Sequence, residues 1–380
     1  MTKFEQLDAM SRENLFAFAL IFFQVVAGPN RQFRRARHVE AICFALERAA
    51  RGETKRLIIT VPPRYLKSYT VAIAFVAWML GKDPGLKFMI ASYGADLAEE
   101  HARGFRLIAD HPDFNRLFPR FVIDRNTADE LTLTGGGGRK AISVGGAATG
   151  HGADILIIDD LLKAGDARSE LLRAKANDFF DITLYSRLNI KAEGVIIVIQ
   201  QRLHEDDLVG HLLEQGGWTH INMPAIADKD VSYPLYRGRS FVREAGDLLA
   251  PELEGHTELD EARRRLGETD FNAQYLLDPV PPDGNTVQME WFGRYHDPLE
   301  RYEYDCVVQS WDTAYSNDPD AAYSVCLTFG ADHGTWDLLD VMRARLNYTE
   351  LIREAKRLHR HWRPDRVLVE HAVRRQNIWH

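Results

Sequence analysis

Three short aliphatic runs, each followed by polar side chains, constrain the fold of this chain more than any other feature. They occupy residues 57–61, 155–158 and 195–199, and all three are rich in β-branched residues. Continuous apolar runs of this length are typical of strands that are buried on both faces, as in parallel sheets covered by helices. We therefore predict an α/β fold with a mainly parallel sheet and helices on both faces.

The first run leads into a candidate phosphate-binding loop. A proline pair ends the strand, and a Lys-Ser pair then precedes an apolar, helix-like stretch at residues 69–80. Strand, tight turn, Lys-Ser and helix is the layout of the loop of a P-loop NTPase. Lys67 is expected to pair with the β- and γ-phosphates of ATP, and Ser68 to bind Mg²⁺. The residues expected to bind the nucleotide are Arg64, Tyr65, Leu66, Lys67, Ser68, Tyr69 and Gln201.

This loop lacks the consensus glycines, whose places are taken by Val61 and Leu66. A Lys-Ser pair after a strand can also simply begin a helix, so the loop alone leaves both interpretations open. The ends of the other two runs favour the nucleotide site, because parallel strands of an α/β sheet bring their carboxyl ends to one edge.

Two carboxylates, Asp159 and Asp160, end the second run. Asp159 is expected to hold the hydrated Mg²⁺, and Asp160 to polarise the attacking water. The alternative is that both residues only cap the next helix. The third run ends in Gln200-Gln201-Arg202, whose polar groups can sense the γ-phosphate.

Composition limits the class of protein. The net charge is −8, so bulk electrostatics does not favour a surface coated with nucleic acid, although arginines cluster locally at residues 31–37. No apolar run is long enough to span a bilayer, and we expect no membrane partner. The three cysteines lie far apart and suit a reducing cytoplasm.

A linker rich in proline and glycine at residues 278–288 separates two predicted domains, residues 1–277 and 289–380. The second domain is expected to hold strands at residues 306–312, 323–329, 335–341 and 366–370, with a helix at residues 349–361 before the last strand. This order is the opening of an RNase H-like fold. Phosphodiester cleavage with two metal ions needs acids on adjacent strands, for which Asp312 and Glu370 are the candidates. A strand-end aspartate can instead be a plain turn residue.

These motifs resemble the large terminase subunit of tailed bacteriophages and prophages, from about Phe23 onward. The segments that carry the resemblance are residues 61–68, 154–160, 198–208, 248–252, 271–275 and 311–314. The resemblance implies ATP-driven packaging of double-stranded DNA into procapsids, with endonuclease cutting that depends on Mg²⁺ or Mn²⁺. It also implies a small terminase subunit, a portal protein and a homo-oligomeric ring as partners, in the host cytoplasm.

Carried over by position, Lys67 and Ser68 match the Walker A lysine and hydroxyl, and Asp159 matches the Walker B aspartate. Asp160 stands where many family members have a catalytic glutamate, and Arg139 is a candidate arginine finger acting across subunits.

The sequence of the second domain departs from the family pattern. His371 stands where an acid is common, Arg374 stands where a small residue is common, and the family continues to a third acid beyond His380. On this basis the nuclease domain is expected to be truncated and to cleave DNA poorly. The alternatives are a P-loop helicase or translocase that is not tied to capsids, and a non-catalytic assembly remnant of a decayed prophage.

Overall fold

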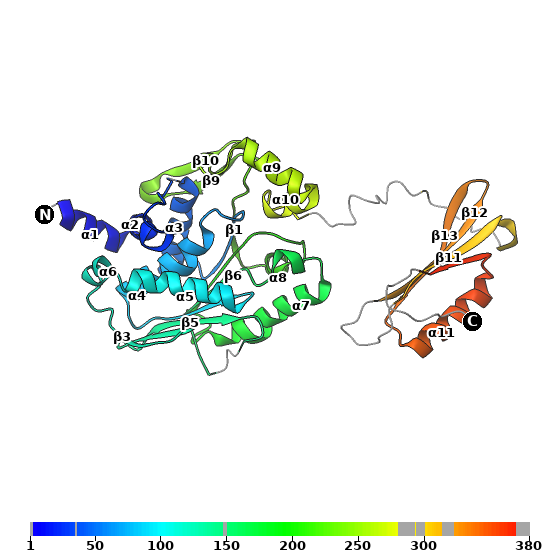
Figure 1. The fold of residues 1–380 in the computed structure, drawn as a ribbon, viewed down its shortest axis with the longest axis horizontal. Helices are drawn as coiled ribbons and strands as arrows, with labels where there is room; N and C mark the ends of the chain where they lie inside the picture. The colour runs from blue at the N-terminus through cyan, green and yellow to red at the C-terminus, as the bar shows by residue number, and fades with distance from the viewer. Residues whose placement is uncertain are drawn as a thin grey trace. The chain divides into compact units, whose positions relative to one another are not determined.

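The computed structural model describes residues 3–34, 36–146, 150–279, 293, 301–313 and 323–369. The chain divides into two compact units, residues 1–286 and 287–380 (Figure 1). Among the described residues no single helix is long and apolar enough to cross a membrane; α1 (Lys3–Glu13) and α2 (Leu15–Ala27) pass that test only as a pair bent by 108°.

An eight-stranded sheet forms the centre of the first unit, in the order β3-β4-β5-β2-β6-β7-β1-β8. The six strands from β5 to β8 run parallel, and β3 and β4 add an antiparallel edge. The sheet is thus mainly parallel, as predicted. Its strands are β1 (Arg56–Thr60), β2 (Lys87–Ser92), β3 (Ile123–Asn126), β4 (Glu130–Leu133), β5 (Gly138–Ser143), β6 (Ile155–Asp159), β7 (Val195–Gln200) and β8 (Thr219–Asn222).

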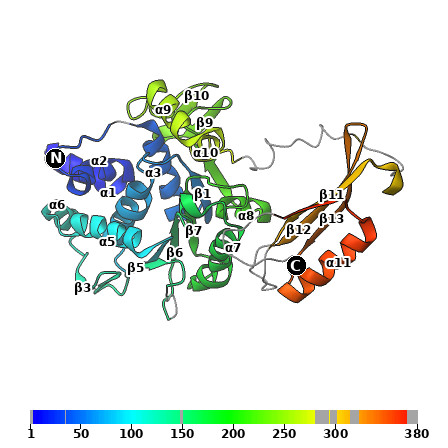
Figure 2. The ribbon, with the colours of Figure 1, turned by 45° about the vertical axis from the view of Figure 1, so that its right-hand side comes forward.

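Helices cover both faces of this sheet (Figure 2). Because strand side chains alternate, Leu57 and Ile59 pack into one core with α2, α3, α4 and α5. Ile58 packs into the opposite core with α7 and α8. The other helices are α3 (Arg37–Ala50), α4 (Val76–Lys82), α5 (Ala95–Ala109), α6 (Pro112–Leu117), α7 (Glu170–Asp178), α8 (Leu208–Gln215), α9 (His256–Leu266) and α10 (Glu268–Gln274).

The helix predicted at residues 69–80 forms in two parts. Its first part is a π-helix, η1 (Tyr69–Phe75), and the second is α4, which ends at Lys82. After α8 and β8 the chain forms a small hairpin of β9 (Val231–Pro234) and β10 (Ser240–Arg243) before α9.

The second unit holds a four-stranded sheet in the order β13-β12-β11-β14. The first three strands are antiparallel neighbours and α11 precedes the fourth strand, as predicted; the structure adds that β14 pairs with β11 in parallel. The apolar stripe of α11 packs on Trp311 and Cys326. The elements are β11 (Cys306–Asp312), β12 (Ser324–Asp332), β13 (Thr335–Ala344), α11 (Tyr348–Trp362) and β14 (Arg366–Val369).

Candidate nucleotide site

Three strand ends meet at one carboxylate in the first unit. Strand β7 lies between β6 and β1, so the loops that follow these strands leave the same edge of the sheet. Lys67 Nζ, from the loop after β1, lies 2.7 Å from Asp160 Oδ2. The Gln201 N–H, after β7, donates to Asp160 Oδ1 at 3.3 Å. The structure therefore brings together Lys67, Asp160 and Gln201, which are far apart in sequence.

Asp159 lies beside this group and is fully buried. Burial raises the pKa of its carboxyl, while Lys67 and then the Ser68 hydroxyl act to lower that pKa. Burial likewise raises the pKa of Asp160, and Lys67 opposes that shift most strongly. The four polar side chains predicted for phosphate and magnesium thus influence one another directly.

The loop adopts left-handed backbone conformations without glycine. Arg64 has φ of 70° and Leu66, at a consensus glycine position, has φ of 61°. Each such residue costs roughly 1–2 kcal/mol relative to glycine. Part of the restraint comes from α3, where the buried His38 ring lies with Nε2 3.1 Å from the Tyr65 carbonyl oxygen. The loop therefore keeps its shape through packing rather than through glycine.

Two of the predicted nucleotide-binding side chains point into the core. Tyr65 is 1% exposed, and the buried Tyr69 hydroxyl donates to the Ala19 carbonyl at 2.6 Å. Only the backbone of these residues is available to a nucleotide. Arg64, by contrast, is exposed, and Leu66 is partly buried.

The prediction that Arg139 is an arginine finger is wrong. A finger must reach a neighbouring subunit, but Arg139 is 3% exposed, on β5, with its guanidinium carbon 5.3 Å from the centre of the Phe105 ring. Burial lowers the pKa of Arg139 to about 9, with a further contribution from Arg106. The residue is part of the core beside α5.

The segment after β7 is held by a buried ion pair. Arg202 Nε lies 3.0 Å from both carboxylate oxygens of Asp207, and Arg202 Nη2 donates to the carbonyls of His204 and Glu205. Asp207 also caps α8 by accepting from the Gly210 N–H. Arg202 is thus engaged within its own loop, which it links rigidly to α8.

Replacing Arg202 by Met is expected to destabilise the protein by about 3–5 kcal/mol, because it leaves the buried Asp207 carboxylate without its cation. The measurement is chemical denaturation of wild type and variant. Arg168→Met is a matched control, since the Arg168–Asp270 ion pair is exposed. Equal stability of the Arg202 variant and wild type would contradict this assignment.

The residues present suit a divalent cation. Both carboxylate oxygens of Asp159 are buried and have no aligned hydrogen bond within the described part of the chain. Leaving such a group unpaired costs free energy, and a bound cation would satisfy it. Ser68 and Asp159 offer the oxygen ligands that Mg²⁺ prefers.

His38 predicts a specific loss of stability in acid. Burial lowers its pKa from 6.5 to about 4, so the unfolded chain binds the extra proton in that window and the folded chain does not. The stabilisation is complete above pH 6.5 and is lost at about 1.4 kcal/mol per pH unit as the pH falls toward 4. We expect His38→Gln, which cannot titrate, to show a shallower decline when both proteins are denatured chemically at pH 7, 6 and 5. Identical slopes would contradict the prediction.

Sequence reasoning missed two histidines near the site, His38 and His101. His101 on α5 has Nε2 3.2 Å from Asp159 Oδ2. Burial, and next the charge of Arg139, lower the pKa of His101 to about 4. A signal was present, because His101 interrupts the apolar face formed by Ala98, Ala102 and Phe105.

In the second unit, Asp312 ends β11 on the face away from α11 and is exposed. Its register partner is Val325, which in turn pairs with Arg343, so these three residues lie in one row across three strands. Trp311 pairs with Val369 on β14, but Glu370 lies outside the described residues. His371 and Arg374 lie outside them too.

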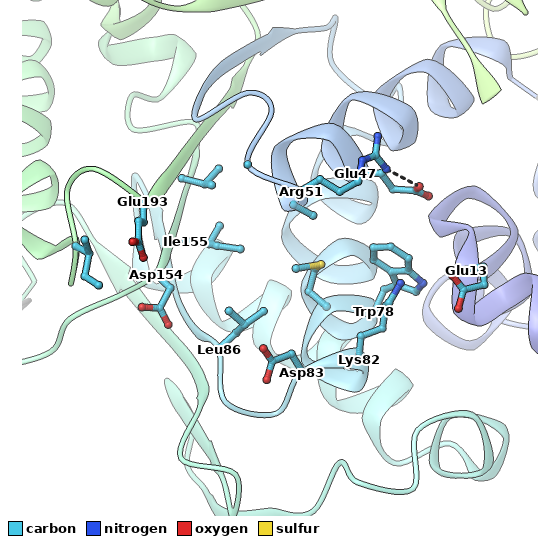
Figure 3. A pocket seen from close by; sticks show the side chains of 16 residues that line it. Glu13, Glu47, Arg51, Trp78, Lys82, Asp83, Leu86, Asp154, Ile155 and Glu193 are labelled. Carbon is cyan, nitrogen blue, oxygen red and sulfur yellow. Dashed lines mark ion pairs between the residues drawn. The ribbon is translucent and has the colours of Figure 1, made fainter. Parts of the chain in front are cut away.

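A separate pocket of about 620 Å³ lies at the opposite edge of the first sheet (Figure 3). Its lining includes Asp154 and Glu193, just before β6 and β7, and Trp78 from α4. Lys82 Nζ lies 4.3 Å from the centre of the Trp78 ring. Because strands β6 and β7 separate it from Asp160 and Gln201, this pocket is not part of the nucleotide site.

Comparison with curated proteins finds a relative in the terminase large subunit of Enterobacteria phage T3. The two are 24% identical over 254 residues, which cover 60% of this chain and 42% of the relative. Over these residues the chain is similar to a phage terminase large subunit. It spans less than half the length of that terminase. No family model matches the chain.

Two solved terminase structures match the chain at low similarity. The large terminase of bacteriophage HK97 is 15% identical, with a TM-score of 0.46, over 92% of this chain and 70% of that one. The large terminase of a thermophilic bacteriophage, solved with ATP-gamma-S, is 11% identical, with a TM-score of 0.40, over 87% of this chain and 76% of that one.

Proposed function

We propose that this chain is the ATP-hydrolysing part of a motor that packages double-stranded DNA into viral procapsids. The observation that carries the proposal is the convergence of Lys67, Ser68, Asp159 and Asp160 at the carboxyl edge of a parallel sheet. This edge is where open α/β sheets bind ligands. The relationship to terminases supplies the substrate, DNA, and the setting, a procapsid.

Lys67 has two roles in this proposal. Without nucleotide it neutralises the partly buried Asp160 carboxylate. Triphosphate offers Lys67 a stronger set of acceptors, so binding would release Asp160 to take the proton of the attacking water. Ser68 and Asp159 would hold Mg²⁺, which neutralises charge on the phosphate oxygens when bound.

The coupling of hydrolysis to motion would pass through Gln201. Its N–H donates to Asp160, and the next residue, Arg202, fixes the loop to α8 through Asp207. A change in the Asp160 carboxylate is thereby passed to a rigid segment rather than to a loose loop. We propose that this segment transmits the conformational change to the bound DNA. The DNA would be bound through its phosphate backbone, so binding would weaken strongly as the salt concentration rises.

The experiment that tests the proposal is ATP hydrolysis by the purified chain with and without duplex DNA. Hydrolysis that duplex stimulates, and that rises further with a portal complex, is the expected result. The rival, a helicase or translocase not tied to capsids, predicts strand separation and no response to a portal. No hydrolysis under any of these conditions would leave only the non-catalytic assembly remnant.

We further propose metal-dependent DNA cleavage at Asp312, with Glu370 as its partner acid. Support comes from the row that Asp312 shares with Arg343, whose guanidinium carbon lies 3.8 Å from the centre of the Tyr323 ring. The Arg345 guanidinium carbon lies 4.2 Å from the same centre. Arginine beside an acidic metal site is suited to a phosphodiester backbone.

Asp312→Asn is expected to abolish any nicking of plasmid DNA in Mn²⁺ or Mg²⁺ while leaving ATP hydrolysis unchanged. Asp305→Asn is a matched control, because Asp305 lies beside the opposite end of the same strand, where it accepts from the His333 N–H. Nicking that survives the Asp312 change would show that cleavage occurs elsewhere or comes from a contaminant.

The remaining partners follow from the relationship to terminases alone. We propose a small terminase subunit, a portal protein and a ring of identical subunits, working at the procapsid in the host cytoplasm.

A further inference from the structure

A buried histidine contacts the candidate metal ligand from a helix outside the phosphate loop. His101, on α5, places Nε2 3.2 Å from Asp159 Oδ2. His101 is 2% exposed and Asp159 is 0% exposed, so water has no access to the contact. The pair joins α5 to the end of β6.

Ordinary core packing does not account for this pair. Buried ring nitrogens and carboxylate oxygens are nearly always hydrogen-bonded in folded proteins. Within the described residues, no nitrogen of His101 and no carboxylate oxygen of Asp159 has an aligned hydrogen bond. Each unpaired group carries a desolvation penalty that no partner offsets. Because two unpaired polar groups lie side by side here, a further polar partner would stabilise them. A cation bound to Asp159 is such a partner.

We propose that His101 is a positioning residue for Asp159: its Nε2 lies 3.2 Å from Oδ2 without an aligned hydrogen bond, and a small rotation of the ring when a cation binds would let Nε2–H donate to Oδ2 and leave Oδ1 for the cation. The inference rests on the proposed nucleotide function. His101 acts only through Asp159 and touches neither metal nor nucleotide. Outer hydrogen bonds of this kind fix the orientation of metal ligands, and losing one typically costs about 10- to 100-fold in metal affinity.

The test measures the affinity of the intact chain for ATP-gamma-S by calorimetry at a series of Mg²⁺ concentrations. Its readout is the Mg²⁺ concentration that gives half of the metal-dependent gain in affinity. His101→Leu and His101→Met remove the donor with side chains of two different shapes, so the result does not rest on the folding of one variant. His101→Gln retains an N–H donor near the position of Nε2.

His211→Leu is the matched control. His211 on α8 also contacts an aspartate, with Nε2 2.8 Å from Asp181 Oδ2, but that pair lies on the surface away from Asp159. Its removal is expected to leave the Mg²⁺ requirement unchanged.

The expected result is that the Leu and Met variants need about 10- to 100-fold more Mg²⁺, and that Gln restores the requirement to within about threefold of wild type. A wild-type Mg²⁺ requirement in either the Leu or the Met variant overturns the inference. So does a Gln variant as impaired as those two, because a purely structural role would give that pattern. Wild-type protein whose affinity for ATP-gamma-S is independent of Mg²⁺ overturns the proposed function itself, and the inference with it.

Discussion

Lys67→Ala is expected to lower the rate of ATP hydrolysis by about 100- to 1,000-fold, because it removes the cation aimed at the phosphates. The same change leaves the partly buried Asp160 carboxylate without its partner 2.7 Å away, which should destabilise the fold by about 1–3 kcal/mol. The two effects are measured separately, by steady-state hydrolysis at a temperature where the variant is folded and by chemical denaturation.

Lys55→Ala provides the control for this change. Lys55 comes immediately before the first residue of β1, at the edge of the sheet opposite the site. Its Nζ donates to the Ala192 carbonyl at 2.7 Å. It should hydrolyse ATP as wild type does. If Lys67→Ala retained wild-type hydrolysis while folded, the loop after β1 would not be the phosphate site.

Asp160→Asn is expected to lower the hydrolysis rate by about 100- to 10,000-fold, the range for loss of a general base. The substitution suits the backbone, because Asp160 has φ of 48° and asparagine tolerates this left-handed conformation well. It also keeps an oxygen to accept from the Gln201 N–H. The change therefore removes proton acceptance with little disturbance of the loop.

Affinity for ATP-gamma-S separates this effect from loss of binding. Asp160→Asn should bind the analogue at least as well as wild type, because Lys67 no longer has to leave a carboxylate to reach the phosphates. Full hydrolysis by the variant would assign the base to another residue. A loss of binding as large as the loss of hydrolysis would instead make Asp160 a structural partner of Lys67.

The sequence predicts the central strands of the sheet well because each strand has a distinctive apolar composition. Apart from Thr60, residues 57–61, 155–158 and 195–199 are apolar, and such runs are typical of strands buried on both faces. The elements of the second unit are equally well predicted, and the two-residue turn between β12 and β13 makes those strands antiparallel. Strand order is not contained in these patterns, so the position of β7 between β6 and β1 emerges only from the structure.

Site residues that follow the end of a strand are predicted from the sequence, whereas a site residue on a helix is missed. Lys67 lies in the loop after β1 and Asp160 directly follows β6, so the direction of the strands brings them together. His101 belongs to α5, and nothing in its local sequence states which strand that helix covers. Arg139 was misjudged for a related reason: a glycine-rich neighbourhood predicts an exposed turn, whereas residues 138–143 form the buried strand β5.

The most direct test of the account is the affinity of wild type, Lys67→Ala and Asp159→Asn for ATP-gamma-S, each with and without Mg²⁺. We predict that wild type binds and that Mg²⁺ tightens binding. Lys67→Ala should bind weakly in both conditions, and Asp159→Asn should bind without any gain from Mg²⁺. Absence of binding by folded wild type, or a gain from Mg²⁺ that survives in Asp159→Asn, would contradict the central claim that Lys67 and Asp159 form one nucleotide site.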